Sequence, residues 1–150
     1  MLSGIARLSA EKSPADFALH RILLPTARAA ADLRHGAPDA ALRELQSVEP
    51  YDLSWDMDLS PIYYRGLAYL KSRQPREAIS QFQKLLAHRS LRPDTIHIPL
   101  AHLAIARAHL LEGDRNRART EYEAFFESWK GADPGIPTLR AARAEYASLE

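Results

Sequence analysis

Three histidines near the middle of the chain could in principle bind a metal ion: His97, His102 and His109. His102 and His109 would share one face of a helix, but their α-carbons would be about 10.5 Å apart along its axis. One ion held by bonds of ~2 Å cannot bridge that distance. Asp56 and Asp58 could bind a hard cation, but two carboxylates are an incomplete ligand set. The sequence therefore predicts no metal site, and packing or surface roles for the histidines.

The stretch HRSLRPDTI, residues 88–96, is similar to the catalytic loop of protein kinases. Ser90 stands where a kinase has its catalytic Asp, and Thr95 stands where it has a metal-binding Asn. The chain has no Gly-rich loop, no strand Lys and no Asp-Phe-Gly, and it is too short for a kinase fold. We therefore interpret the stretch as a solvated linker with a turn at Pro93-Asp94.

No other combination of residues indicates catalysis. There is no nucleophile with a paired base, no phosphate-binding loop and no plausible acid/base pair. Arg115, Arg117 and Arg119 could contact phosphate, but Glu121 and Glu123 offset their charge, so a solvated face is expected. The sequence predicts a protein that is not an enzyme and that needs no cofactor.

Composition narrows the class of protein. The chain has 150 residues, of which 46% are hydrophobic and 26% charged, as in one soluble folded domain. Lys and Arg total 20 and Asp and Glu total 19, a balance that argues against binding nucleic acid. No cysteine, signal peptide or apolar run of membrane-spanning length is present. We expect a cytoplasmic protein with no membrane partner.

The pattern of apolar residues predicts an all-α fold without strands. Ser13 and Pro14 are suited to start a helix that runs to Gly36, with Pro25 expected to kink or divide it. Further helices are predicted over 40–48, 61–72, 75–88, 100–111, 115–129 and 138–149. Linkers are predicted over 50–60, 91–99 and 131–137.

The helices come in pairs, and the pairs repeat. Ala41, Ala78 and Ala118 each lie five residues after a turn, at Gly36, Arg73 and Gly113. Their spacings are 37 residues (41 to 78) and 40 residues (78 to 118). Each is preceded by a small residue at position −12 and followed by bulky apolar residues at +4 and +7: Ala29, Gly66 and Ala106; Leu45, Phe82 and Tyr122; Val48, Leu85 and Phe125. Chance alanines on generic amphipathic helices are a weaker explanation, because three units stay in phase.

This pattern resembles the tetratricopeptide repeat. The middle unit, IYYRGLAYLKSRQPREAISQFQKLL, has Gly66, Tyr69, Ala78 and Phe82 at the family's spacings. In the third unit His109 replaces the usual Tyr, and in the first unit Asp32 does. The resemblance implies a solenoid of about three repeats, at 14–50, 61–90 and 99–130, flanked by a half repeat at 1–12 and a capping helix at 137–149. Its small residues would let two antiparallel helices approach closely while large residues fill the space beside them.

A second resemblance concerns the parent protein. Residues 14–149, and most specifically WKGADPGIPTLRAARAEY, are similar to the C-terminal repeat tails of bacterial eukaryotic-like serine/threonine kinases and of winged-helix regulators. Such tails are non-catalytic modules for protein contact or regulation. Because the array begins in mid-unit, we expect that this chain is part of a longer protein.

The resemblance also implies a binding surface on the first helix of each pair. The predicted partner-binding residues are Arg34, Tyr63, Leu67, Leu70, Lys71, Leu103, Arg107 and Leu110, with Thr26, Ala30, Leu33 and Leu111 beside them. Such a surface suits a peptide with apolar anchors and some acidic character. The alternative is that these side chains are buried against neighbouring helices or a second copy. The Asn residues with which related domains hold a C-terminal carboxylate are absent, so a receptor for chaperone tails is not expected.

Three functions remain open from the sequence. The first is a scaffold that binds another protein, a peptide or another domain of its parent chain. The second is a sensor that encloses a small ligand between helices. The third is a homo-oligomerisation module, such as a homodimer.

Overall fold

The computed structural model describes residues 13–53 and 59–149, and this part of the chain contains helices and no strand. The predicted all-α class is therefore confirmed, while the predicted half repeat at 1–12 lies outside the described residues. The α-helices are α2 (Pro14–Ala18), α3 (Leu24–Arg34), α4 (Pro38–Gln46), α5 (Ser60–Lys71), α6 (Pro75–Ala87), α7 (His97–Glu112), α8 (Arg115–Ser128) and α9 (Pro137–Ala147). A π-helix, η1 (Leu19–Leu23), and two 3₁₀ turns, η2 (Glu49–Tyr51) and η3 (Arg89–Leu91), complete the order.

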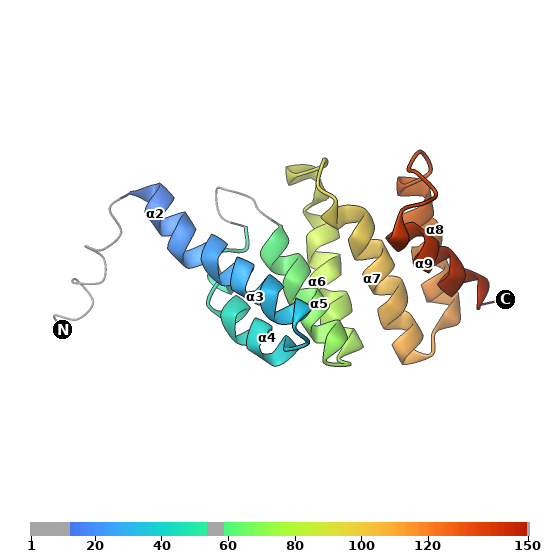
Figure 1. The fold of residues 1–150 in the computed structure, drawn as a ribbon, viewed down its shortest axis with the longest axis horizontal. Helices are drawn as coiled ribbons and strands as arrows, with labels where there is room; N and C mark the ends of the chain where they lie inside the picture. The colour runs from blue at the N-terminus through green and yellow to red at the C-terminus, as the bar shows by residue number, and fades with distance from the viewer. Residues whose placement is uncertain (1–12, 54–58, 150) are drawn as a thin grey trace.

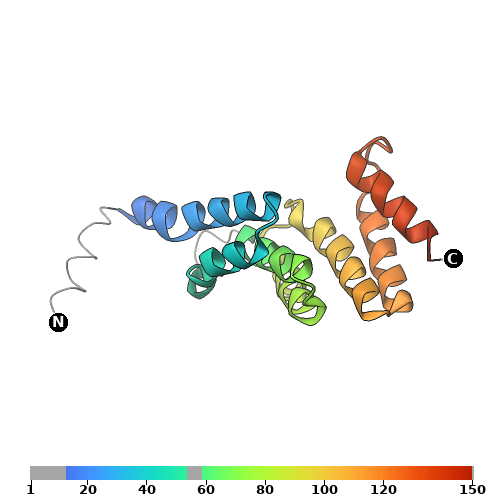
Figure 2. The ribbon, with the colours of Figure 1, turned by 60° about the horizontal axis from the view of Figure 1, so that its bottom comes forward.

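The helices form an elongated row of antiparallel pairs. Figure 1 shows the row along its long axis, with α2 and α9 at its opposite ends. The pairs are α3/α4, α5/α6 and α7/α8; α4 then packs on α5, and α6 packs on α7. The first helices also contact one another, α3 with α5 and α5 with α7 (Figures 1 and 2). Helix α9 packs on α8 at the C-terminal end.

The first described helical segment contains a proline, Pro25, next to a π-helical turn. The Ser13 hydroxyl accepts a hydrogen bond from the Asp16 N–H at 3.1 Å, as expected of an N-cap. Pro25 lies in the first turn of α3, directly after the π-helical segment. Proline lacks an N–H and clashes with the preceding turn, and a wider π turn relieves that conflict. The predicted division of this helix is thus present as a π-helix between α2 and α3.

The three turns between paired helices have the same backbone geometry. Gly36, Arg73 and Gly113 have φ angles of +75°, +56° and +80°, in the left-handed region. In each turn the N–H of the next residue bonds back across the helix end at 2.9 Å: Ala37 to Asp32, Gln74 to Tyr69, and Asp114 to His109. This is the Schellman ending of a helix. The three accepting residues are those aligned in the sequence, so the repeat extends to the backbone hydrogen bonds.

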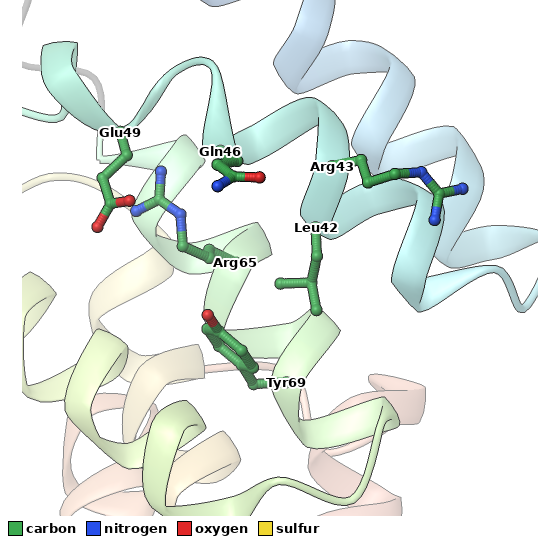
Figure 3. Close-up of a pocket in the computed structure, with 6 residues that line it drawn as sticks. All are labelled: Leu42, Arg43, Gln46, Glu49, Arg65 and Tyr69. Atoms are coloured by element: carbon green, nitrogen blue, oxygen red, sulfur yellow. The ribbon is translucent and has the colours of Figure 1, made fainter.

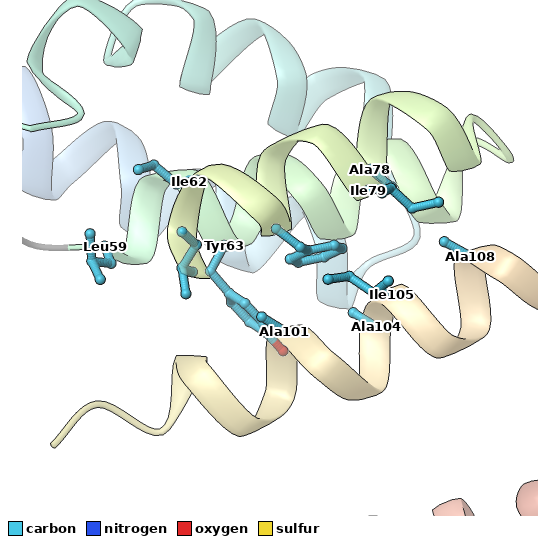
Figure 4. Close-up of a cluster of buried hydrophobic side chains, with 11 residues drawn as sticks. Leu59, Ile62, Tyr63, Ala78, Ile79, Ala101, Ala104, Ile105 and Ala108 are labelled. Atoms are coloured by element: carbon cyan, nitrogen blue, oxygen red, sulfur yellow. The ribbon is translucent and has the colours of Figure 1, made fainter. Parts of the chain in front are cut away.

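The small residues of the pattern are where the paired helices meet. Ala29, Ala41, Ala78, Ala106 and Ala118 have 0% of their surface exposed. A Cβ placed on Gly66 would be 2.6 Å from Cε1 of Phe82, which is itself fully buried. The predicted close approach at these positions is therefore confirmed. Figure 4 shows the resulting core between α5, α6 and α7, including Ile62, Tyr63, Ala78, Ile105 and Ala108.

One boundary differs from the predictions. The linker predicted over 91–99 is shorter, because α7 already begins at His97. Pro99 lies within the first turn of α7, where its missing N–H breaks no intrahelical bond. At the C-terminal end, Glu145 of α9 accepts hydrogen bonds from Arg107 and Tyr122.

Candidate functional site

On α5 the predicted binding residues divide into buried and accessible ones. Tyr63 is 9% exposed, and its ring stacks on His97 at a centroid distance of 4.6 Å, so it belongs to the core instead of an open surface. Burial raises the pKa of Tyr63 to about 12, because the neutral phenol is favoured away from water. Leu67 and Leu70 are half-buried against the same core, while Lys71 is exposed at the end of the helix.

On α7 the division is similar. Leu103 is 2% exposed and packs against Ala118, Tyr122 and Leu139, so its predicted role on an open surface is wrong. Leu110 is half-buried at the edge of that cluster, and Leu111 beside it is 41% exposed. An α-helix with apolar side chains on most of its circumference must bury the majority of them, which explains the loss of Leu103 to the core.

The accessible predicted residues are therefore fewer than the sequence indicated. We call the set Arg34, Leu67, Leu70, Lys71, Arg107, Leu110 and Leu111 the inner surface. Its members come from α3, α5 and α7, which lie side by side. Thr26 and Leu33 of α3, also expected there, are 5% and 4% exposed and belong to the interior.

Helix α9 closes one end of the inner surface. The Arg107 side chain donates two hydrogen bonds to the Glu145 carboxylate, at 2.9 and 2.8 Å, and the Tyr122 hydroxyl donates a third at 2.6 Å. The hydrogen bond to Glu145 is the main cause of a raised pKa of Arg107. Burial is the main cause of a raised pKa of Tyr122, with the Glu145 hydrogen bond next. Arg107 is thus already paired with Glu145. A binding partner would contact this ion pair instead of a free guanidinium.

The three histidines near the middle of the chain each contact a neighbouring side chain. His97 stacks on Tyr63, the His102 ring nitrogen lies 2.7 Å from Glu121, and buried His109 lies 3.3 Å from Glu112. Within the described residues no group of three or more metal-ligating side chains comes together. Asp56 and Asp58 lie outside the described residues.

A buried ion pair was missed by the sequence analysis. Arg65 of α5 and Asp52, just after η2, are 3% and 4% exposed and form a bidentate pair at 2.7 and 3.0 Å. The Lys84 ammonium adds a second cation at 2.7 Å from Asp52. The signal in the sequence was a lone Arg between apolar residues in YYRGLAYL, on the side of the helix that faces its neighbours. Asp52 gave no such signal, because it lies in a loop.

Comparison with models of known protein families gave no match, and comparison with curated proteins gave none either. Among the described helices, none is both long enough and apolar enough to cross a membrane.

Proposed function

We propose that this chain is a non-catalytic scaffold of the tetratricopeptide type that binds another protein, or another domain of its parent chain, through the inner surface. One observation carries the proposal. Three helix pairs repeat the same turn geometry and the same small-residue contact, and their first helices line up Leu67, Leu70, Leu110 and Leu111 on partly exposed positions. In stacked repeats such a shared face is the usual binding surface.

The chemistry of the inner surface defines the partner. Exposed and half-buried leucines supply apolar contact area, while Arg34 and Lys71 are exposed cations. This combination suits a short helix or extended segment with apolar anchors flanked by acidic residues. The similarity of WKGADPGIPTLRAARAEY to bacterial kinase and regulator tails supports a regulatory role in a larger signalling protein.

The test uses a displayed library of random 12-residue peptides selected against the full chain. We expect the enriched peptides to share leucine-like anchors and acidic residues, and to lose most of their affinity for Leu111→Glu and for Lys71→Glu. Leu91→Glu is the matched control, since Leu91 is 39% exposed and lies on η3, away from the inner surface. Enriched peptides that bind all three variants equally would overturn the proposal.

Light scattering on the same proteins distinguishes the scaffold function from homodimer formation. A dimer of wild type that dissociates in Leu111→Glu, with no peptide enriched, would replace the scaffold with a self-association module. A monomer at micromolar concentration that binds the enriched peptides supports the scaffold.

A further inference from the structure

A pocket of about 360 Å³ lies at one edge of the row of helices, within the size range of small-molecule sites. Its walls are the linker 93–96, the first turn of α7, and Ser128 and Trp129 at the end of α8. Figure 1 shows that the segment between α6 and α7 and the end of α8 lie on the same edge of the molecule. None of the pocket residues belongs to the inner surface, so this pocket is distinct from the proposed partner-binding surface.

Most of the pocket wall is apolar. Ile96 is 54% exposed, the largest value among the big hydrophobic side chains of the described residues. Ile98 and Pro99 of α7 add aliphatic surface, and the Trp129 indole forms the wall on the α8 side. The Trp129 ring lies 4.9 Å from that of Phe125, measured between centroids, and this contact ties the indole to the buried core. A ligand with a short aliphatic chain would cover this wall and remove it from water.

The charge of the pocket selects the other end of the ligand. Among the residues that line it, Asp94 alone is charged, and its side chain is 79% exposed. Its partner, Arg92, lies 3.8 Å away and is itself exposed, so this ion pair is weak and a cation in the pocket can compete with it. Glu127 and Lys130, next to the α8 wall, pair with each other at 2.6 Å, so their charges cancel.

The helix ends at the pocket do not reverse this preference. The C-terminal end of α8 has a partial negative charge, which also favours a cation. The N-terminal end of α7 has a partial positive charge, but its first N–H groups are occupied. The His97 N–H donates to the Thr95 hydroxyl at 3.4 Å, and the Ile98 N–H donates to the Thr95 carbonyl at 3.3 Å. Pro99 has no N–H, so a ligand anion finds no free donor at the first three positions of this helix.

We propose that this pocket binds the protonated amine of an aliphatic chain, with the ammonium group at Asp94 and the chain against Ile96 and Trp129. An indole is also the aromatic side chain that cations contact most favourably. A free aliphatic amine and a lysine side chain of another protein present this same chemistry, and the experiment distinguishes them. The proposal does not depend on the scaffold function, because the two sites share no residue.

The test titrates the ¹⁵N-labelled chain by NMR at neutral pH and constant ionic strength. Three probes share a six-carbon chain: hexylammonium, hexanol and hexanoate. The chain has two tryptophans, so Trp55→Phe identifies the indole N–H signal of Trp129. We expect a saturable shift of that signal with hexylammonium, affinity about two- to five-fold lower for hexanol, and lower still for hexanoate, which Asp94 repels.

The pocket between α4 and α5 supplies an internal control. Figure 3 shows Arg43, Arg65 and Glu49 among its lining residues, with Tyr69 on the adjacent wall. The cations that line this pocket outnumber its one acid, so hexylammonium should leave the Tyr69 backbone amide signal in place. Equal responses at Tyr69 and Trp129 would contradict the proposal, because the amine would then bind without regard to charge.

The two exposed ion pairs near the pocket give matched variants. Asp94→Asn should lower the affinity for hexylammonium about two- to five-fold and leave that for hexanol nearly unchanged. Glu127→Gln removes an acid that does not line the pocket and should change neither. Arg92→Gln should raise the affinity for hexylammonium up to about two-fold, because it frees Asp94, whereas Lys130→Gln should not. All four positions are exposed, so the fold should tolerate each change.

A fourth probe, Nα-acetyl-lysine-N-methylamide, identifies the source of the amine. Tighter binding than hexylammonium indicates a lysine side chain of another protein, and weaker binding indicates a free amine; either result supports the site. The proposal is overturned by no saturable shift with any probe, or by hexanol or hexanoate that binds the wild type as tightly as hexylammonium. It is also overturned if Asp94→Asn and Glu127→Gln lower the affinity equally, because the acid at the pocket would then have no special role.

Discussion

The ring of Phe82 packs so closely on Gly66 that a Cβ there would be 2.6 Å from Cε1 and 2.7 Å from Cζ. This contact joins α5 to α6 in the middle pair. Gly66→Ala would force the fully buried ring to move within a packed core, at a cost of about 1–3 kcal/mol. The better helix propensity of Ala returns up to about 1 kcal/mol. We therefore expect a net loss of about 1–2 kcal/mol in the free energy of unfolding, measured by urea denaturation.

Gly131→Ala is the matched control, because nothing lies within 4 Å of a Cβ at that position. Its free energy of unfolding should stay within about 0.5 kcal/mol of wild type. Phe82→Leu introduced into Gly66→Ala should restore part of the loss, since the smaller side chain leaves room. Equal stability of Gly66→Ala and Gly131→Ala would show that the close helix contact does not depend on the glycine.

Arg73 occupies a turn position that glycine holds in the other two pairs. Its φ of +56° costs an L-residue about 1–2 kcal/mol, whereas glycine adopts it freely but loses about 0.5–1 kcal/mol of chain entropy. Arg73→Gly should therefore raise the free energy of unfolding by up to about 1 kcal/mol in thermal or urea unfolding. Gly113→Ala, at the equivalent turn with φ of +80°, should lower it. A loss of stability in Arg73→Gly would mean that the exposed Arg73 side chain makes contacts that outweigh the strain.

The sequence predicted the repeated helix contacts more accurately than it predicted which side chains are exposed for binding. Small residues at fixed spacing determine which helix faces meet, so Gly66, Ala78, Ala106 and Ala118 were placed correctly from periodicity alone. Exposure depends on what a neighbouring element covers. Leu103 is buried because Leu139 of α9 belongs to the same hydrophobic cluster. Tyr63 is buried because His97 stacks on its ring. The sequence predicted a linker at His97, but this residue begins α7.

The buried Arg65–Asp52 pair is a contact that the sequence pattern could not predict. Its two members are 13 residues apart and on different elements, so no helical period relates them. Only the fold brings the loop after η2 against α5. Local patterns predict helices and their contacts, whereas a polar contact between a loop and a helix depends on tertiary structure.

The buried phenol of Tyr63 should make the protein less stable at alkaline pH. Its pKa is raised to about 12 in the folded state from an ordinary value near 10, chiefly by burial. The stability that this shift represents is complete below pH ~10 and is lost as the pH rises toward 12. Between these values Tyr63 contributes a slope of about −1.4 kcal/mol per pH unit to the free energy of unfolding. Tyr63→Phe should reduce the alkaline slope by about that amount in urea denaturation, and the two proteins should run parallel from pH 7 to 9. A slope that Tyr63→Phe leaves unchanged would contradict this assignment.

Glu145 should determine how firmly α9 packs on the rest of the chain. Burial alone would raise its pKa, but hydrogen bonds from Arg107 and Tyr122 outweigh burial and lower it. The contact is therefore complete above the ordinary carboxyl pKa of about 4.3 and is lost as the pH falls through the lower folded value. At neutral pH, Glu145→Gln weakens the bonds to Arg107, so we expect α9 amide protons to exchange with deuterium about two- to five-fold faster.

Arg143→Gln is the control for this experiment, because Arg143 lies on the exposed face of α9 and should leave exchange unchanged. The acceleration in Glu145→Gln should be confined to α9 and to the turns of α7 and α8 that carry Arg107 and Tyr122, because these two residues bond to Glu145. On acidification below pH ~4, wild-type α9 should lose its chemical-shift dispersion before the paired helices do, whereas Glu145→Gln should show no such step. An acceleration spread evenly over α3 to α8 would instead mean that Glu145 supports the whole array, and that α9 unfolds only together with the helix pairs.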